Sequence, residues 1–196
     1  MVKISMVMGL MAILLYLYLF MSVKKHLKAE RGALIHLILS MVYTLWLPLP
    51  LALVFKNDLD HLLILGGLFG GLSLVVGALV MIVQASHLSY ACKHLKEETY
   101  YDQVNGWVLN GLIGSQVELY AGVLKFIWIL FVTLYHLSQS AWFLAAVSAA
   151  FLLVNALYIP SLISDNLKVD WRLKTNQVII HLETLLWYGF VLYLLV

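Results

Sequence analysis

Charged side chains are scarce in this sequence. Asp, Glu, Lys and Arg make up 11% of its 196 residues, whereas 63% of the residues are hydrophobic. A soluble domain carries about 25% charged residues, so this chain has too few polar side chains to cover a surface that faces water. The composition excludes a soluble enzyme or binding domain for the chain as a whole. We therefore expect lipid to face most of the protein.

Cysteine and the short motifs of several enzyme classes are also scarce or missing. Cys92 is the only cysteine, so an intramolecular disulfide is impossible and CxxC metal or redox motifs are absent. The sequence contains neither the HExxH pattern of zinc proteases nor the GxSxG pattern of serine hydrolases. No basic run is dense enough to predict a nucleic-acid partner. We predict no metal site and can name no catalytic residue.

What the chain has instead is a series of long apolar segments. Each has about the 20 residues that a helix needs to cross a bilayer. They lie near 2–23, 33–55, 61–85, 107–135, 142–163 and 177–196. We predict an all-α, polytopic membrane protein with six transmembrane helices in a single domain, 1–196. We expect it in the plasma membrane, as a multi-pass protein of the bacterial cytoplasmic membrane.

Basic residues are distributed unevenly among the loops between these segments. Three alternate loops hold nine of the twelve Lys and Arg residues, namely Lys24, Lys25, Lys28, Arg31, Lys93, Lys96, Lys168, Arg172 and Lys174. The opposite side holds only Lys3 and Lys56. Loops rich in Lys and Arg stay in the cytoplasm. We therefore predict that these three loops are cytoplasmic and that the N-terminus and C-terminus are both outside.

The basic loops also resemble one another. Residues 25–30 read KHLKAE, residues 93–98 read KHLKEE, and residues 166–170 read NLKVD. This similarity predicts three repeated helical hairpins that turn in the cytoplasm, by analogy with transporters built from repeats. The alternative is that Lys, His, Leu and Glu are simply common at the cytoplasmic end of a helix.

Small residues mark the third segment as a packing surface. Gly66, Gly67, Gly70 and Gly71 form two overlapping GxxxG pairs. Such pairs let helices approach closely where lipid provides no hydrophobic driving force. We predict that these glycines pack against another helix of the same bundle. The alternative is a seam in a homo-oligomer or against a membrane partner subunit.

The fourth segment carries the strongest functional signal. Glu118 and Lys125 are seven residues apart, which places them on one face of a helix. An ionisable side chain inside the bilayer costs several kcal/mol and often marks an ion or solute pathway. Glu118 is predicted near the middle of the bilayer, so we take it as the first candidate for binding a ligand or a proton. The alternative role is a polar clamp between helices.

Further polar side chains gather in the predicted cytoplasmic half of the other segments. They are His36, Gln84, His87, Asn155, His181 and Glu183. Helical spacing puts Gln177, His181 and Thr184 on one face and directs Glu183 elsewhere. We expect Lys125, Asn155, His181, Glu183 and His36 to line or gate a path that includes Glu118.

These residues support several functional hypotheses. The leading one is transport or channelling of a small solute or ion, proton-linked, through a polar cavity open to the cytoplasm. The main alternative is a non-catalytic membrane subunit or scaffold of a larger complex. A third hypothesis is a redox membrane subunit that holds a b-type haem between His36 and His181 or binds a quinone. A fourth is an enzyme that acts at the inner leaflet. The sequence does not establish any catalysis.

Overall fold

The computed structural model describes residues 1–28, 31–94, 116–156, 160 and 177–196. Every regular element within these ranges is an α-helix. The helices are α1 (Val2–Lys28), α2 (Gly32–Trp46), α3 (Pro48–Lys56), α4 (His61–His94), α6 (Gln116–Ser138), α7 (Trp142–Ala156) and α9 (Gln177–Leu195). The all-α fold expected from the composition is therefore confirmed. The predicted helix over 107–135 is described only from Gln116 onward.

Several of these helices are long and apolar enough to cross a membrane. Within the described ranges, four such spans are Val2–His26, Gly32–Lys56, His61–Tyr90 and Val117–Ser138, and two shorter apolar helices are Trp142–Ala156 and Ile180–Leu195. The helices are those of an integral membrane protein. The number of spans that cross the bilayer and the orientation of the termini stay predictions.

Proline divides the second span into two helices. α2 ends at Trp46 and α3 begins at Pro48. The Leu47 amide donates to the Thr44 carbonyl oxygen at 3.3 Å, which tightens the last turn of α2. Proline has no amide hydrogen and is tolerated in the first turn of a helix, where no intrahelical acceptor is needed. Leu47 keeps right-handed helical dihedral angles, φ −53° and ψ −35°, so the interruption is local.

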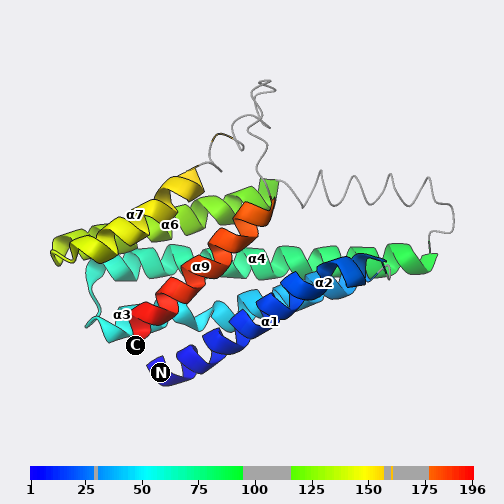
Figure 1. Cartoon of the computed structure of the whole chain (residues 1–196), viewed down its shortest axis with the longest axis horizontal. Coiled ribbons are helices and arrows are strands. Elements are labelled where there is room, and N and C mark those ends of the chain that lie inside the picture. Colours follow the sequence, from blue (N-terminus) through cyan, green and yellow to red (C-terminus); the bar gives the residue numbers. More distant parts are fainter. Residues whose placement is uncertain (29–30, 95–115, 157–159, 161–176) are drawn as a thin grey trace.

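The helices form an antiparallel bundle that α9 crosses obliquely (Figure 1). α4 lies between α2 and α6, α1 packs on α2, and α7 packs on α6. α9 contacts α1, α3 and α7. Both chain termini, the α3–α4 connection and the α6–α7 connection lie at one end of the bundle (Figure 1). Helices that alternate in direction along the chain produce this arrangement.

Two polar contacts tie helix ends together at that end of the bundle. The Lys56 ammonium, at the end of α3, donates to the Leu194 carbonyl oxygen in the last turn of α9 at 2.9 Å. The Tyr135 hydroxyl of α6 donates to Asn57 Oδ1 at 2.9 Å. A cation near the C-terminus of a helix also interacts favourably with the helix dipole. These contacts connect α3 to both α9 and α6.

Asp60 caps α4, and its replacement should destabilise the fold. Its Oδ1 accepts the amide hydrogens of Leu62 at 2.8 Å and Leu63 at 3.4 Å. Asp60→Ala should lower the free energy of unfolding by about 1 kcal/mol, because it leaves these two amides without their acceptor. An SDS titration of the detergent-purified protein, followed by circular dichroism, measures this change. Asp60→Asn keeps an acceptor and should remain close to wild type; an equal loss in both variants would contradict the capping role.

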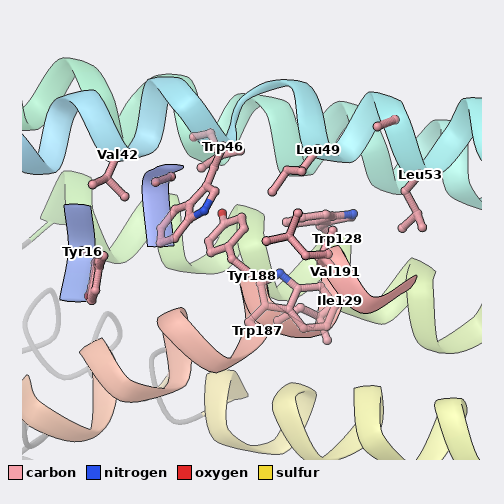
Figure 2. Close-up of a cluster of buried hydrophobic side chains, with 14 of the residues drawn as sticks. Tyr16, Val42, Trp46, Leu49, Leu53, Trp128, Ile129, Trp187, Tyr188 and Val191 are labelled. Atoms are coloured by element: carbon pink, nitrogen blue, oxygen red, sulfur yellow. The ribbon is translucent and has the colours of Figure 1, made fainter. Parts of the chain in front are cut away.

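Aromatic side chains occupy the centre of the core (Figure 2). Trp46 of α2 stacks on Tyr188 of α9, with ring centroids 3.9 Å apart and an interplanar angle of 10°. Trp128 of α6 meets Trp187 of α9 edge to face, at 5.2 Å and 84°. All four side chains are fully buried. Such pairs add about 0.5–1.5 kcal/mol each beyond the area they bury, so α9 is fixed in the bundle by α2 and α6.

The outer face of α1 is apolar. Ile4, Val7, Met11, Leu14 and Met21 are each more than half exposed. Their spacing places them along one stripe of the helix. A continuous exposed apolar stripe marks a surface that contacts another apolar phase rather than water. Lipid contact along this stripe agrees with the membrane assignment.

Two glycines of α4 make room for α6. A Cβ atom at Gly70 would lie 2.5 Å from Trp128 Cδ2, and one at Gly66 would lie 2.8 Å from Phe131 Cβ. Real Cβ atoms do not approach other atoms this closely. The absence of side chains at these two positions therefore permits the close approach of α4 and α6.

The other two glycines of the GxxxG pairs differ from each other. A Cβ atom at Gly67 would lie 3.0 Å from Val54 Cγ2 and 3.5 Å from the Pro50 carbonyl oxygen, both on α3. A Cβ atom at Gly71 would meet no atom of the described bundle within 4 Å. Gly67 thus faces a helix of the same chain, whereas Gly71 faces the outer surface of the bundle.

Candidate functional site

A buried ion pair joins α6 to α9. The Lys125 ammonium donates to Glu183 Oε2 at 2.6 Å. Both side chains are less than a tenth exposed, and both helices are strongly apolar. A single charge in this position would be costly, and an opposite charge at hydrogen-bond distance offsets much of that cost. Two residues from the set expected to line a path therefore contact each other directly.

Two further polar side chains contact this pair. Asn155 of α7 donates through Nδ2 to Glu183 Oε1 at 2.7 Å. Lys125 also donates to Thr184 Oγ1 at 3.1 Å. All four side chains are buried. We call Lys125, Asn155, Glu183 and Thr184 the ion-pair cluster; it brings together α6, α7 and α9.

Lys125 bonds two adjacent residues of α9. Helical spacing alone directs Glu183 away from the face that carries Thr184, yet Lys125 contacts both. Neighbouring residues on a helix point about 100° apart, and a long lysine side chain that ends between them reaches both. Glu183 and Thr184 can therefore point in different directions and still share Lys125 as a partner.

One buried atom of the cluster has no hydrogen-bond partner among the described residues. Asn155 is fully buried, and its Oδ1 accepts no hydrogen bond from any described residue. Its Nδ2 is used twice, on Glu183 and on the Phe151 carbonyl oxygen at 2.9 Å. Leaving a buried acceptor unsatisfied costs about 1–3 kcal/mol. Such an atom in a native fold calls for an explanation, of which a bound water or ion is one.

A second polar contact continues from the cluster toward α1. His181 lies on α9 just before Glu183, and its Nδ1 is hydrogen-bonded to the Tyr16 hydroxyl at 2.7 Å. Tyr16 is buried and packs on Trp46, with ring centroids 5.6 Å apart. Sequence reasoning identified His181 but missed Tyr16. A tyrosine within a run of apolar residues does not indicate, from sequence alone, which side chain its hydroxyl will bond.

Glu118 lies outside the ion-pair cluster. It accepts a hydrogen bond from Gln84 Nε2 of α4 at 3.2 Å, and its side chain is exposed. Seven residues separate it from Lys125, about 10 Å along a helix. Gln84 is buried, and its Oε1 lacks a partner among the described residues. The structure thus places the two acidic candidates in separate pairs, each with a carboxamide.

The histidines proposed as haem ligands have different surroundings. His36 Nδ1 donates to the Gly32 carbonyl oxygen at 2.9 Å, within α2, whereas His181 bonds Tyr16. No hydrogen bond within the described helices links the two imidazoles. His87 Nε2 is buried on α4 without a partner in the described ranges. The structure therefore adds no support to the haem hypothesis.

Other predicted features lie partly outside the residues that the structure describes. Residues 29–30 and 95–115 are not described, so the KHLKAE and KHLKEE motifs cannot be compared and the repeat stays a prediction. The side chain of Gln177 also lies outside the described residues. Within those residues, no group of three or more His, Cys, Asp or Glu side chains could hold a metal ion.

Comparison with known proteins assigns no family to the chain. No protein-family model matches it, and neither a curated protein nor a solved structure is similar to it. Its candidate site is therefore defined by its own chemistry, a lysine and a glutamate paired between apolar helices and supported by a buried asparagine and a threonine.

Proposed function

We propose that this protein transports or channels a small solute or ion, in a proton-linked manner, with the ion-pair cluster as its binding site. The observation that carries the proposal is the 2.6 Å contact between Lys125 and Glu183 inside apolar helices. Stability is a weak reason to keep such a pair, because apolar residues of similar volume in its place are often equally stable or better. Ionisable residues inside a membrane more often belong to ion, proton or solute pathways.

The positions of the neighbouring polar groups support access from one side. Glu118 lies in the first turn of the described part of α6, and His181 lies near the start of α9. α6 and α9 both begin away from the end of the bundle that holds the two termini and run toward it (Figure 1). Glu118 precedes Lys125 on α6, and His181 precedes Glu183 on α9. The predicted orientation makes the end opposite the termini cytoplasmic. We therefore propose a polar path that opens to the cytoplasm, in a bacterial cytoplasmic membrane.

Flux in proteoliposomes tests this function. Liposomes that contain the protein and a trapped pH-sensitive dye should dissipate an imposed proton gradient faster than protein-free liposomes, when the transported solute or ion is supplied. Glu183→Gln should reduce this rate to near that of protein-free liposomes, because it removes the charged acceptor of the site. A panel of inorganic ions and small organic solutes identifies the substrate class.

Two variants serve as comparisons in the same assay. Thr133→Val removes a buried hydroxyl that bonds within α6, to the Ile129 carbonyl oxygen at 2.8 Å, and should keep the wild-type rate. Glu118→Gln tests the other acidic pair. Loss of flux in Glu118→Gln but not in Glu183→Gln would place the site at Gln84 and Glu118 instead. A wild-type rate equal to that of protein-free liposomes for every ion and solute would reject the function.

A membrane subunit or scaffold is the second candidate function. The surface around Gly71 favours it, because Gly71 meets no described atom within 4 Å and Leu68 and Leu72 beside it are exposed. A notch of this kind can receive a helix of a second copy or of a partner subunit. This candidate predicts a stable oligomer or a co-purified membrane partner in mild detergent, together with no flux.

A further inference from the structure

We infer that the ion-pair cluster is a site for a small monovalent cation, which competes with the Lys125 ammonium for the Glu183 carboxylate. The inference rests on the proposed function and narrows its substrate to a sodium-like ion exchanged for a proton. In the structure, the Lys125 ammonium, which is fixed to α6, occupies the position that the free cation would take.

The first support is that the lysine nitrogen already occupies a position lined by oxygen. Its neighbours include Glu183 Oε2 at 2.6 Å and Thr184 Oγ1 at 3.1 Å. Carboxylate, hydroxyl and carbonyl oxygens are the ligands that hard cations prefer. A cation that takes the place of the ammonium would meet the same two oxygens.

The second support is the unused oxygen of Asn155. Asn155 Oδ1 is fully buried and has no partner in the described helices, while Nδ2 of the same carboxamide donates to Glu183 Oε1 at 2.7 Å. The two ends of a carboxamide have nearly the same shape and opposite hydrogen-bonding character. With the ammonium in place, the NH₂ group faces the carboxylate. With a free cation in place, rotation of the carboxamide presents Oδ1 to the cation and satisfies the orphan oxygen.

Charge balance determines what must accompany cation binding. The pair of Lys125 and Glu183 is neutral overall, and an added cation would leave a buried net charge, which is costly between apolar helices. The cost is avoided when an N–H bond of the ammonium breaks and the proton leaves to water. Lys125 then remains as a neutral amine and the cation takes over its charge. Each bound cation therefore releases a proton, and the exchange is electroneutral.

Titratable groups on several helices interact with this pair. Tyr43 on α2 and Tyr188 on α9 interact electrostatically with Glu183, and His181 on α9 interacts with Lys125. Glu118 on α6 and Tyr16 on α1 interact in turn with these groups. The groups contributed by α7 and α4, Asn155 and Gln84, do not titrate. Of these groups, only His181 has a side chain that ordinarily changes charge near neutral pH. Substituting Lys125 and His181 in separate variants therefore distinguishes protons released by Lys125 from protons released by His181.

The composition of the cluster favours a monovalent cation over a divalent one. It offers one carboxylate, one hydroxyl and one carboxamide oxygen. Divalent and transition-metal sites use several carboxylate, imidazole or thiolate ligands, and the described residues hold no such group.

Cation titration of the purified protein tests the inference. Sodium, lithium or potassium chloride is added to the protein in weakly buffered detergent, with choline chloride keeping the ionic strength constant. We expect a saturable release of protons, measured with a pH indicator dye, at the same cation concentrations that change the fluorescence of Trp187. Trp187 is fully buried and lies one helical turn beyond Glu183. Absence of both signals with all three cations overturns the inference.

Variants separate the roles of the two charged residues. Lys125→Met should still bind the cation but release no proton, because the exchanging ammonium is gone. Its melting temperature should rise with sodium, since the cation restores the missing positive charge and binds only the folded state. Glu183→Gln should lose the cation-dependent fluorescence change, and His181→Gln should keep the proton release. A Lys125→Met protein that melts at the same temperature with sodium and with choline contradicts the inference, even if it is poorly folded.

The proteoliposome assay distinguishes this inference from the proposed function. A proton flux that is equal in sodium and in choline overturns the cation site and leaves proton-linked transport of another solute. Cation binding in detergent without any flux overturns transport and leaves the site. Sodium-dependent proton flux that Glu183→Gln abolishes supports both.

Discussion

Replacing Lys125 with methionine should lower the free energy of unfolding by about 3–5 kcal/mol in sodium-free buffer, because breaking a buried ion pair leaves an uncompensated charge. The remaining charge is that of Glu183, which keeps the hydrogen bonds from Asn155 and Thr184 but loses its cationic partner. Glu183→Gln should have a loss of similar size, since the ammonium then loses its charged partner. Unfolding by SDS in mixed micelles, followed by circular dichroism, provides the measurement.

The double variant Lys125→Met/Glu183→Gln should recover most of this stability. It removes both charges and leaves a glutamine that Asn155 can still bond. The two single losses should therefore not add, and the difference measures the coupling between the residues. Lys56→Met is the matched control, because Lys56 is an exposed lysine that bonds a carbonyl oxygen of α9, and it should cost about 1 kcal/mol or less. Fully additive single losses would contradict a direct pair.

Gly70→Ala should also destabilise the bundle strongly, by about 1–3 kcal/mol, as overpacked cores do. The added Cβ would lie 2.5 Å from Cδ2 of Trp128 and 2.9 Å from Cε2 and Cε3. The indole has little freedom to move, because it is buried between Trp187 and Tyr188. The same SDS titration measures the loss, and a thermal melt provides an independent value.

Gly71→Ala is the matched comparison for this substitution. The two glycines are adjacent on α4, yet the described atoms leave open space around a Cβ at Gly71. Alanine is a better helix former than glycine by about 1 kcal/mol, so this variant should be as stable as wild type or more so. Equal destabilisation of both variants would show that the cost comes from the helix itself and not from Trp128.

The sequence predicted the class of fold because composition and segment length depend on few details. The pairing of side chains depends on many more. Lys125 and Glu183 are 58 residues apart, and no local rule specifies that their helices meet. Glu118 ranked first because a carboxylate within a span is conspicuous in any sequence. The more buried carboxylate is that of Glu183, whose position near the predicted end of a helix made it less noticeable.

The glycines show the same division between what spacing predicts and what it leaves open. GxxxG spacing indicates that something approaches the helix closely, but it does not identify the approaching group. At Gly70 that group is the large, flat indole of Trp128 rather than a second small residue. Neither this contact nor the stack of Trp46 on Tyr188 follows from periodicity, because each requires the arrangement of two helices from separate parts of the chain to be known first.

The long sequence separation of the ion pair also has a consequence for biosynthesis. Lys125 leaves the ribosome 58 residues before Glu183, about 3–12 s earlier at the usual 5–20 residues per second. Asn155 lies between them and offers no charge. During that interval α6 must enter the translocon or the bilayer before Lys125 can pair with Glu183, a state that a neutral amine or a snorkelling side chain permits. Insertion of α9 therefore supplies the negative charge that balances Lys125 of α6, several seconds after α6 is made. A chain truncated before Glu183 lacks this charge and should be a target for membrane quality control.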